Sequence, residues 1–261
     1  MTAPRRVWLV SYPKSGNTWF RFVLFFLSHG RPPETSRELD AFINAKLPPR
    51  PGDVYKKSHA RVDFLLPHLG ADDKIVYIYR HPLDVLQSAL NYAALNGELS
   101  PGGANEWIDA YIEEGGHALW RESGFDAGRW AENVEGWLAH RGHPIHFIRY
   151  EDALVDLAHE VVGLAGFLGA DASPSIIEGC VTATAFDELR RFEEEELSAA
   201  KKLQKPLGRF SVSARTAAAE RGVRFFNRGA AEAYRETMSD DQIRRGWAVF
   251  GPMAEPLGYA P

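Results

Sequence analysis

The stretch Val7-Trp-Leu-Val-Ser-Tyr-Pro-Lys-Ser-Gly-Asn-Thr-Trp-Phe-Arg-Phe-Val-Leu-Phe-Phe-Leu27 decides the fold of this 261-residue chain. It opens with a short apolar run, Val7 to Val10, that is typical of a buried strand. The run breaks at Tyr12-Pro-Lys-Ser-Gly-Asn17, where Pro restricts φ and Gly relieves it, as in a tight turn. From Thr18 onward apolar residues recur at helical spacing. The stretch therefore predicts a strand, a loop and a helix in direct succession.

Such a loop is a candidate anion site. A strand that feeds a tight loop at the start of a helix brings unpaired N–H groups and the positive helix end to one point, which suits phosphate. Lys14 adds a mobile cation, and Ser15, Asn17 and Thr18 add polar donors. The loop of nucleoside triphosphatases has Gly, four residues and then Gly-Lys-Ser/Thr, whereas here Lys14 precedes Gly16 and the earlier Gly is absent. From this stretch alone, an ordinary start to an α/β domain stays open.

The eight residues Tyr-Pro-Lys-Ser-Gly-Asn-Thr-Trp closely resemble the 5′-phosphosulfate loop of the sulfotransferases that use 3′-phosphoadenosine 5′-phosphosulfate (PAPS). The resemblance implies a single α/β domain over residues 1–261, with a central parallel sheet flanked by helices and a P-loop-like phosphosulfate-binding loop. It also implies that the loop residues bind the cofactor, with Lys14 acting in catalysis as well; these residues are Lys14, Ser15, Gly16, Asn17, Thr18 and Trp19.

A second segment, Asp53-Val-Tyr-Lys-Lys-Ser-His59, alternates like a short strand. It resembles the family's strand that ends in Lys-Thr/Ser-His, in which the His acts as the base on the acceptor hydroxyl. The resemblance implies that His59 is the catalytic base and that Lys57 contacts the sulfonate. A surface or core histidine is the other interpretation, because the chain has nine histidines.

A third segment, Asp73-Lys-Ile-Val-Tyr-Ile-Tyr-Arg80, predicts a strand, and Pro82 with Asp84 suits the first turn of a helix after it. Arg80 then lies at the carboxyl end of a strand, where α/β sheets bind ligands. Arg-x-Pro-x-Asp-Val-x-x-Ser resembles the family's 3′-phosphate site and implies that Arg80 and Ser88 bind there, since the donors of Arg match phosphate. A salt bridge for Arg80 and a helix-surface position for Ser88 are the alternatives.

Two further segments resemble the family's adenine site. Pro144–Tyr150 predicts a strand followed by Glu-Asp, which implies that Tyr150 packs beside the adenine. Thr182–Leu189 resembles a Thr-Ser-Phe segment over the adenine and implies that Thr184 and Phe186 bind the cofactor. Helix-core and capping roles would explain these last two residues as well.

The last segment, Phe225–Ser239, partly resembles a loop of the pattern Arg-Lys-Gly-x-x-Gly-Asp-Trp-Lys that returns to hold the 3′-phosphate. Arg228 and Gly229 are retained and Asn227 replaces a basic residue; the resemblance implies that all three bind the cofactor, with a weaker clamp on the phosphate. The stretch from Arg235 to Arg244 does not reproduce the dimer motif of the family, so the oligomeric state stays open.

The remaining stretches predict helices and one insertion. Residues 91–129 are rich in Gly and aromatic residues, which favours an acceptor-binding insertion or lid, although the aromatics could be plain core. Amphipathic helices are predicted from Trp130 to His140 and from Ala153 to Leu168. The charged stretch from Arg190 to Lys205, which contains four consecutive glutamates, predicts a solvated helix face.

Composition limits the class of protein. Hydrophobic residues make up 45% and charged residues 25%, as in a soluble globular protein, and the net charge of −5 argues against a general nucleic-acid binder. The single cysteine, Cys180, cannot form an internal disulfide and favours a reducing cytoplasm. The apolar stretch behind the N-terminal arginines is broken by Pro13 and Lys14, unlike a secretory signal. The run Trp19–Leu27 contains Arg21 and is shorter than the about 20 residues of a membrane span.

The segments that carry the resemblance follow one another in the family's order, which predicts a cytosolic-type PAPS-dependent sulfotransferase similar to the small-molecule enzymes of bacteria. The resemblance implies PAPS as donor, 3′-phosphoadenosine 5′-phosphate (PAP) as product, a small-molecule hydroxyl as acceptor and in-line transfer with His59 as base. No metal is expected, because no cluster of His, Cys and carboxylates occurs at ligand spacing. A P-loop small-molecule kinase that uses ATP and Mg²⁺, and a non-catalytic nucleotide-binding module, remain as alternatives. The acceptor could be a phenol, an aliphatic alcohol, a glycan or a lipid-linked hydroxyl.

Overall fold

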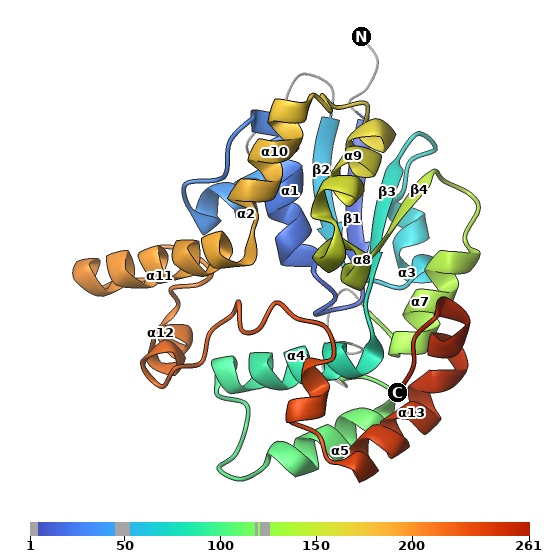
Figure 1. The fold of residues 1–261 in the computed structure, drawn as a ribbon, viewed down its shortest axis with the longest axis vertical. Helices are drawn as coiled ribbons and strands as arrows, with labels where there is room; N and C mark the ends of the chain where they lie inside the picture. The colour runs from blue at the N-terminus through green and yellow to red at the C-terminus, as the bar shows by residue number, and fades with distance from the viewer. Residues whose placement is uncertain (1–4, 45–52, 118–119, 121–125) are drawn as a thin grey trace.

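Four parallel strands form the centre of the structure, in the order β2-β1-β3-β4 (Figure 1). The computed structural model describes residues 5–44, 53–117, 120 and 126–261. The strands are β1 (Arg5–Ser11), β2 (Asp53–Ser58), β3 (Lys74–Tyr79) and β4 (Ile145–Arg149). All four coincide with strands expected from the apolar runs, and the α/β class with a central parallel sheet is confirmed.

Helices cover both faces of this sheet and extend beyond one end of it (Figure 1). The α-helices are α1 (Asn17–His29), α2 (Ser36–Ile43), α3 (Val62–Leu65), α4 (Pro82–Asn96), α5 (Ala104–Glu114), α7 (Trp130–Ala139), α8 (Tyr150–Val155), α9 (Leu157–Leu168), α10 (Pro174–Ala183), α11 (Phe186–Leu203), α12 (Ser213–Glu220) and α13 (Asp240–Ala254). Three short 3₁₀ helices, η1 (Leu66–His68), η2 (Ala233–Glu236) and η3 (Glu255–Leu257), join them among the residues described.

The alternation of side chains along β1 divides the core into two layers. Val7 and Leu9 point to the face covered by α1, α2, α9 and α10, whereas Trp8 and Val10 point to the face covered by α3 and α7. A third apolar cluster joins α4, α5, α7 and α13, and Tyr12 at the end of β1 reaches into it. The loop after β1 therefore lies where all three clusters meet.

The strand order places a binding crevice at the end of β1. The chain passes from β1 to its neighbour β2 and then crosses to the other side of β1 to form β3. A parallel sheet opens a crevice at the carboxyl ends of its strands where the order reverses, because the flanking connections leave in opposite directions. The loop after β1 and the ends of β2 and β3 border this crevice.

Two helical expectations need correction. Residues 91–129 are less irregular than predicted, because α4 continues to Asn96 and α5 covers Ala104–Glu114; residues 118–119 and 121–125 of this range lie outside the described residues.

The helix expected from Ala153 to Leu168 is divided into α8 and α9 at Asp156, whose carboxylate accepts the backbone N–H of His159 at 3.0 Å and so starts a new helix.

The predicted solvated face of residues 190–205 is wrong for two of its four consecutive glutamates. Glu193 and Glu196 are only 3% and 6% exposed, because positions three apart share the inner face of α11. Glu193 accepts the backbone N–H groups of Phe225 and Phe226 at 2.8 and 3.0 Å. Glu196 accepts the backbone N–H and the hydroxyl of Ser36 at 2.6 and 2.7 Å. These carboxylates thus anchor distant segments to α11.

Across the residues that the structure describes, no helix combines the length and the apolar character that crossing a membrane requires.

Candidate active site

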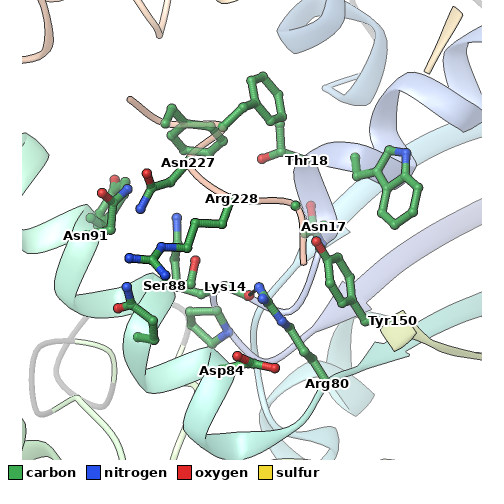
Figure 2. A pocket seen from close by; sticks show the side chains of 18 of the residues that line it. Lys14, Asn17, Thr18, Arg80, Asp84, Ser88, Asn91, Tyr150, Asn227 and Arg228 are labelled. Carbon is green, nitrogen blue, oxygen red and sulfur yellow. Dashed lines mark hydrogen bonds between the residues drawn. The ribbon is translucent and has the colours of Figure 1, made fainter. Parts of the chain in front are cut away.

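A cavity of about 470 Å³ opens at the crevice beyond the carboxyl ends of β1, β2 and β3 (Figure 2). Most of the site residues expected from the sequence line it, although they come from six separate segments. They are Lys14, Gly16, Asn17, Thr18, Trp19, Lys57, His59, Arg80, Ser88, Tyr150, Phe186, Asn227, Arg228 and Gly229. Figure 2 shows Lys14, Arg80, Ser88 and Arg228 around the same space, with Tyr150 beside Arg80.

The loop after β1 takes its shape from two positive φ angles. Lys14 has φ 71° and Gly16 has φ 104°, so the chain turns sharply before α1 begins at Asn17. A Cβ atom on Gly16 would lie 2.7 Å from Cδ2 of Tyr150, which leaves room only for glycine. The first turn of α1 receives no side-chain cap, so its N–H groups are available to an anion in the cavity.

Two expected site residues do not line the cavity. Ser15 is fully buried, and its hydroxyl has no hydrogen-bond partner within the described part of the chain. Thr184 is the C-cap of α10, and its hydroxyl donates to the carbonyl of Cys180 at 2.8 Å. The carbonyl of Thr184 accepts the indole N–H of Trp19 at 2.9 Å, so Thr184 positions Trp19, which lines the cavity, without lining the cavity itself.

Lys14 is held by aromatic rings. Its Nζ lies 4.3 Å from the ring centre of Tyr92 and 4.5 Å from that of Phe225. Burial, together with the positive charges of Arg209, Arg215 and Arg80, lowers the pKa of Lys14 from 10.5 to about 7. An anion in the cavity would offset those charges and favour the protonated form.

His59 follows β2 directly and lines the same cavity as Lys14. Its Nδ1 is 2.9 Å from the carbonyl oxygen of Ser11, and since a carbonyl can only accept, Nδ1 carries the proton and Nε2 the lone pair. Burial and the positive charges of Lys57, Arg209 and Lys14 lower the pKa of His59 to about 3. His59 is therefore neutral at physiological pH, as a proton acceptor must be.

Lys57, near the end of β2, is a further cation that lines the cavity. Burial, followed by the charges of Arg209 and Arg21, lowers its pKa to about 8. Lys57 and Lys14 therefore belong to a group of cations packed closely enough to oppose each other's protonation, as expected of a site built for a polyanion.

Arg80, which follows β3, joins the loop after β1 to the C-terminal part of the chain. Its Nη1 donates to the carbonyl of Lys14 at 3.3 Å and its Nη2 to that of Ala230 at 3.4 Å. The guanidinium lies 4.2 Å from the ring centre of Tyr150. Its Nε is buried and has no hydrogen-bond partner among the residues described. Arg80 is thus held in place while one donor stays uncommitted.

The segment that carries Asn227, Arg228 and Gly229 is tied to α4 and α11. Asp84 of α4 accepts the backbone N–H groups of Glu232 and Tyr234 at 2.7 and 3.3 Å. Gly229 has φ 59°, and a Cβ atom there would lie 2.2 Å from Cδ2 of Phe186, so glycine is required at this approach. Arg228 lines the cavity and pairs with Glu236.

Sequence reasoning missed several residues of the cavity wall, above all Arg209. It lines the cavity, whereas Arg215 packs behind it and donates to the hydroxyl of Tyr92 at 3.2 Å. Neither arginine belongs to a motif, and no regular pattern marks their segment. The one available signal was the series of basic residues that begins in the last turn of α11; those residues are Lys201, Lys202, Lys205, Arg209 and Arg215.

Comparison with known proteins identifies related sequences. A family model for the sulfotransferase domain matches residues 4–255. Human sulfotransferase 1C2 is 25% identical over 205 residues, which cover 72% of this chain and 66% of that protein. Human sulfotransferase 4A1 is 30% identical over 191 residues, which cover 67% of this chain and 63% of that protein. The chain thus spans slightly less than two thirds of the length of these curated relatives.

Solved structures share the fold. Mouse sulfotransferase SULT7A1 complexed with PAP superposes with a TM-score of 0.67 at 21% identity, covering 97% of this chain and 85% of that one. Retinol dehydratase in a complex with retinol and PAP gives a TM-score of 0.66 at 16% identity, covering 97% of this chain and 82% of that one. At these identities the likeness is one of architecture.

Proposed function

Because this chain belongs to the sulfotransferase domain family, we propose that it transfers the sulfuryl group of PAPS to the hydroxyl of a small-molecule acceptor. One observation carries the proposal: a phosphate-type loop with Lys14 and a neutral histidine, His59, line the same cavity. A nucleotide-binding module would have no use for the histidine. A kinase would need a carboxylate-held Mg²⁺ at this loop.

The residues present fit a nucleotide with phosphates at both ends. Lys14 and the uncapped N–H groups of α1 suit the 5′-phosphosulfate, whereas Arg80, Ser88 and Arg228 suit the 3′-phosphate. The buried Nε of Arg80 has no hydrogen-bond partner within the described chain, as expected of a donor kept for a ligand. Three aromatic residues that line the same cavity would flank the adenine: Trp19, Tyr150 and Phe186.

When bound, PAPS supplies the sulfuryl group: the acceptor oxygen bonds to sulfur in line as the sulfur–oxygen bond to the 5′-phosphate breaks, and PAP leaves. Lys14 stabilises the negative charge that develops at the departing end, because a preorganised cation acts most strongly in a site that excludes water. Lys57 neutralises the oxygens of the group in transfer. No covalent bond to the enzyme is required.

His59 accepts the proton of the acceptor hydroxyl at Nε2. The hydrogen bond from Nδ1 to Ser11 fixes the ring and the tautomer. In the empty cavity, Lys57 and Lys14 help to hold the pKa of His59 low. Negative charge beside these lysines offsets them, so His59 becomes a stronger base when the donor is present.

The range 91–129 supplies part of the wall on the acceptor side in this proposal. Asn91 and Tyr92 of α4 line the cavity, and so does Trp120. Aromatic and amide side chains at this position would contact an acceptor placed beside His59, so this range would act as the acceptor-binding insertion.

A calorimetric titration tests the proposal. The protein is titrated with PAP and with ATP, each with and without Mg²⁺, followed by a turnover assay with PAPS over a panel of phenols and alcohols. We expect metal-independent binding of PAP that is lost in Arg80→Ala. A preference for ATP with Mg²⁺ would instead favour the kinase, and PAP binding without turnover on any acceptor would favour the binding module.

A further inference from the structure

Arg209 is a cation of the cavity that the proposed cofactor site does not use. It lies between α11 and α12 and lines the cavity. Its Nη1 is buried and makes no hydrogen bond within the described part of the chain. The neighbouring Arg215 is committed, since it donates to the carbonyl of Arg209 at 2.5 Å and to the hydroxyl of Tyr92 at 3.2 Å. Arg215 thus supports the segment, whereas Nη1 of Arg209 makes a long ion-pair contact, 3.9 Å to Oδ1 of Asp40, and the residue lines the cavity.

Arg209 is attached to the helix that packs on the strand before His59. Its backbone N–H donates to the hydroxyl of Ser36 at 3.0 Å, and its Nη1 lies 3.9 Å from Oδ1 of Asp40. Both partners belong to α2, which packs on β2, the strand that leads to His59. Arg80 and Ser88 enter the cavity from a different direction, from the end of β3 and from α4.

The protein does not neutralise Arg209 fully. Two carboxylates act on Arg209, and both have other partners: Asp40 lies 2.5 Å from Nη2 of Arg21, a fully buried arginine, and Glu196 accepts two hydrogen bonds from Ser36. Asp40 therefore serves two guanidinium groups. The positive charge of Arg209 reaches Lys57, His59 and Lys14, whose pKa values it helps to lower. A largely buried cation without its own counter-charge is costly, so an anion at this position would stabilise the site.

We infer that Arg209 binds an anionic group of the acceptor, so that the acceptor is a hydroxyl compound that also carries a carboxylate or a similar oxyanion. This inference rests on the proposed function and names its substrate class. The anions of the donor are already matched by Lys14, Lys57, Arg80 and Arg228, whereas an acceptor held beside His59 lies within the electrostatic reach of Arg209. The guanidinium offers paired donors that match a carboxylate. Arg209 is thus a specificity-determining residue.

The test compares matched acceptors on the complex of the protein with PAP. A series of 4-hydroxyphenyl carboxylates with side chains of increasing length, and the amide of each, is titrated calorimetrically. We expect at least one carboxylate to bind about tenfold or more tightly than its amide, the effect of one charge-assisted hydrogen bond. Arg209→Gln should remove this difference and Arg209→Lys should keep part of it, while both variants bind PAP within about threefold of the wild type.

A matched control and three outcomes make the result decisive. Arg244→Gln removes an exposed arginine of α13 that pairs with Asp241, and it should leave the preference for carboxylates unchanged. If no carboxylate binds more tightly than its amide, the inference is overturned. If Arg209→Gln folds but loses PAP, Arg209 belongs to the cofactor site, and the inference is again overturned. If the wild type does not bind PAP, the proposed function fails first and the inference fails with it.

Discussion

At the scale of a single residue, Lys14 combines a chemical role with a cost in stability. Its pKa falls from 10.5 to about 7 because it is buried among arginines. Below pH 7 the lysine is charged in both the folded and the unfolded state. The folded state then bears the full free-energy cost of holding this charge in a buried site among arginines. Between pH 7 and 10.5 the unfolded state binds more protons, so the contribution of Lys14 to stability becomes less unfavourable as the pH rises.

Lys14→Met should therefore abolish most turnover and yet stabilise the fold. We expect sulfuryl transfer to fall by orders of magnitude, while the free energy of unfolding at pH 7 rises by about 1–2 kcal/mol, the range for relieving an unfavourable functional site. Urea denaturation at pH 7 and near pH 10 measures this gain, which should shrink toward the higher pH. A gain that is equal at both values would contradict the assigned pKa.

His59→Ala should separate chemistry from donor binding. The variant should bind PAP nearly as well as the wild type but lose turnover by orders of magnitude, because the acceptor proton then has no base. His68→Ala, an exposed histidine on η1, is the control and should behave as the wild type. Near-normal turnover of His59→Ala in a PAPS assay would rule out the role assigned to this side chain.

The position of several residues at the cavity could be predicted from the sequence because it follows from local context. Lys14 and Arg80 each follow a buried strand, and parallel strands bring their carboxyl ends together. Arg209 could not be predicted, since its position depends on how the segment after α11 folds back onto α2. The burial of the Ser15 side chain could not be predicted either, because it follows from a loop in which Lys14 takes a positive φ.

At the scale of elements, α11 acts as an anchor for the segment that closes the cavity. Glu193→Ala should leave two backbone N–H groups without an acceptor, the part-buried one of Phe225 and the buried one of Phe226. We expect a loss of about 1–3 kcal/mol in the free energy of unfolding and weaker PAP binding, because Asn227 and Arg228 follow directly. Denaturation and calorimetry measure the two effects.

Glu194→Ala is the matched control for this change. Glu194 is the next residue of the same helix but is exposed, so its removal should alter neither stability nor PAP affinity beyond about 0.5 kcal/mol. Equal effects of the two variants would mean that net charge, rather than the anchor, is responsible. The composition of the four consecutive glutamates predicts that all of them are exposed. Only the helical repeat separates the inner positions of α11 from the outer ones.

At the scale of the whole molecule, an acidic chain with net charge −5 surrounds a cavity rich in cations. Salt should therefore weaken the attraction between this cavity and an anion that arrives from solvent. Raising the ionic strength from about 0.05 to 0.5 M should weaken PAP binding but change the stability of the ligand-free protein little, because salt screens buried charges much less than exposed ones. Thermal unfolding and calorimetry at both ionic strengths check this, and an affinity that does not change with salt would contradict it.

PAP should in turn stabilise the whole fold. At a free concentration about 100 times its Kd, a ligand that binds only the folded state adds about 2.7 kcal/mol to the free energy of unfolding. Arg80→Ala should show little of this gain, since it removes a donor of the proposed 3′-phosphate site. A similar gain in the variant would show that PAP binds elsewhere.

The connection between α11 and α12 is a stretch of chain separate from the strands that hold the phosphate loop. Strand ends and the helices after them supply Lys14, His59 and Arg80, whereas Arg209 belongs to a connection that is attached through Ser36. A library that varies only residues 204–212 would therefore change the wall of the cavity around Arg209 and leave Lys14, His59 and Arg80 in the chain. Variants that remove the charge of Arg209 should also raise the pKa values that it lowers. The same separation would let related enzymes diverge in the acceptor that they modify while they keep the same sulfuryl donor.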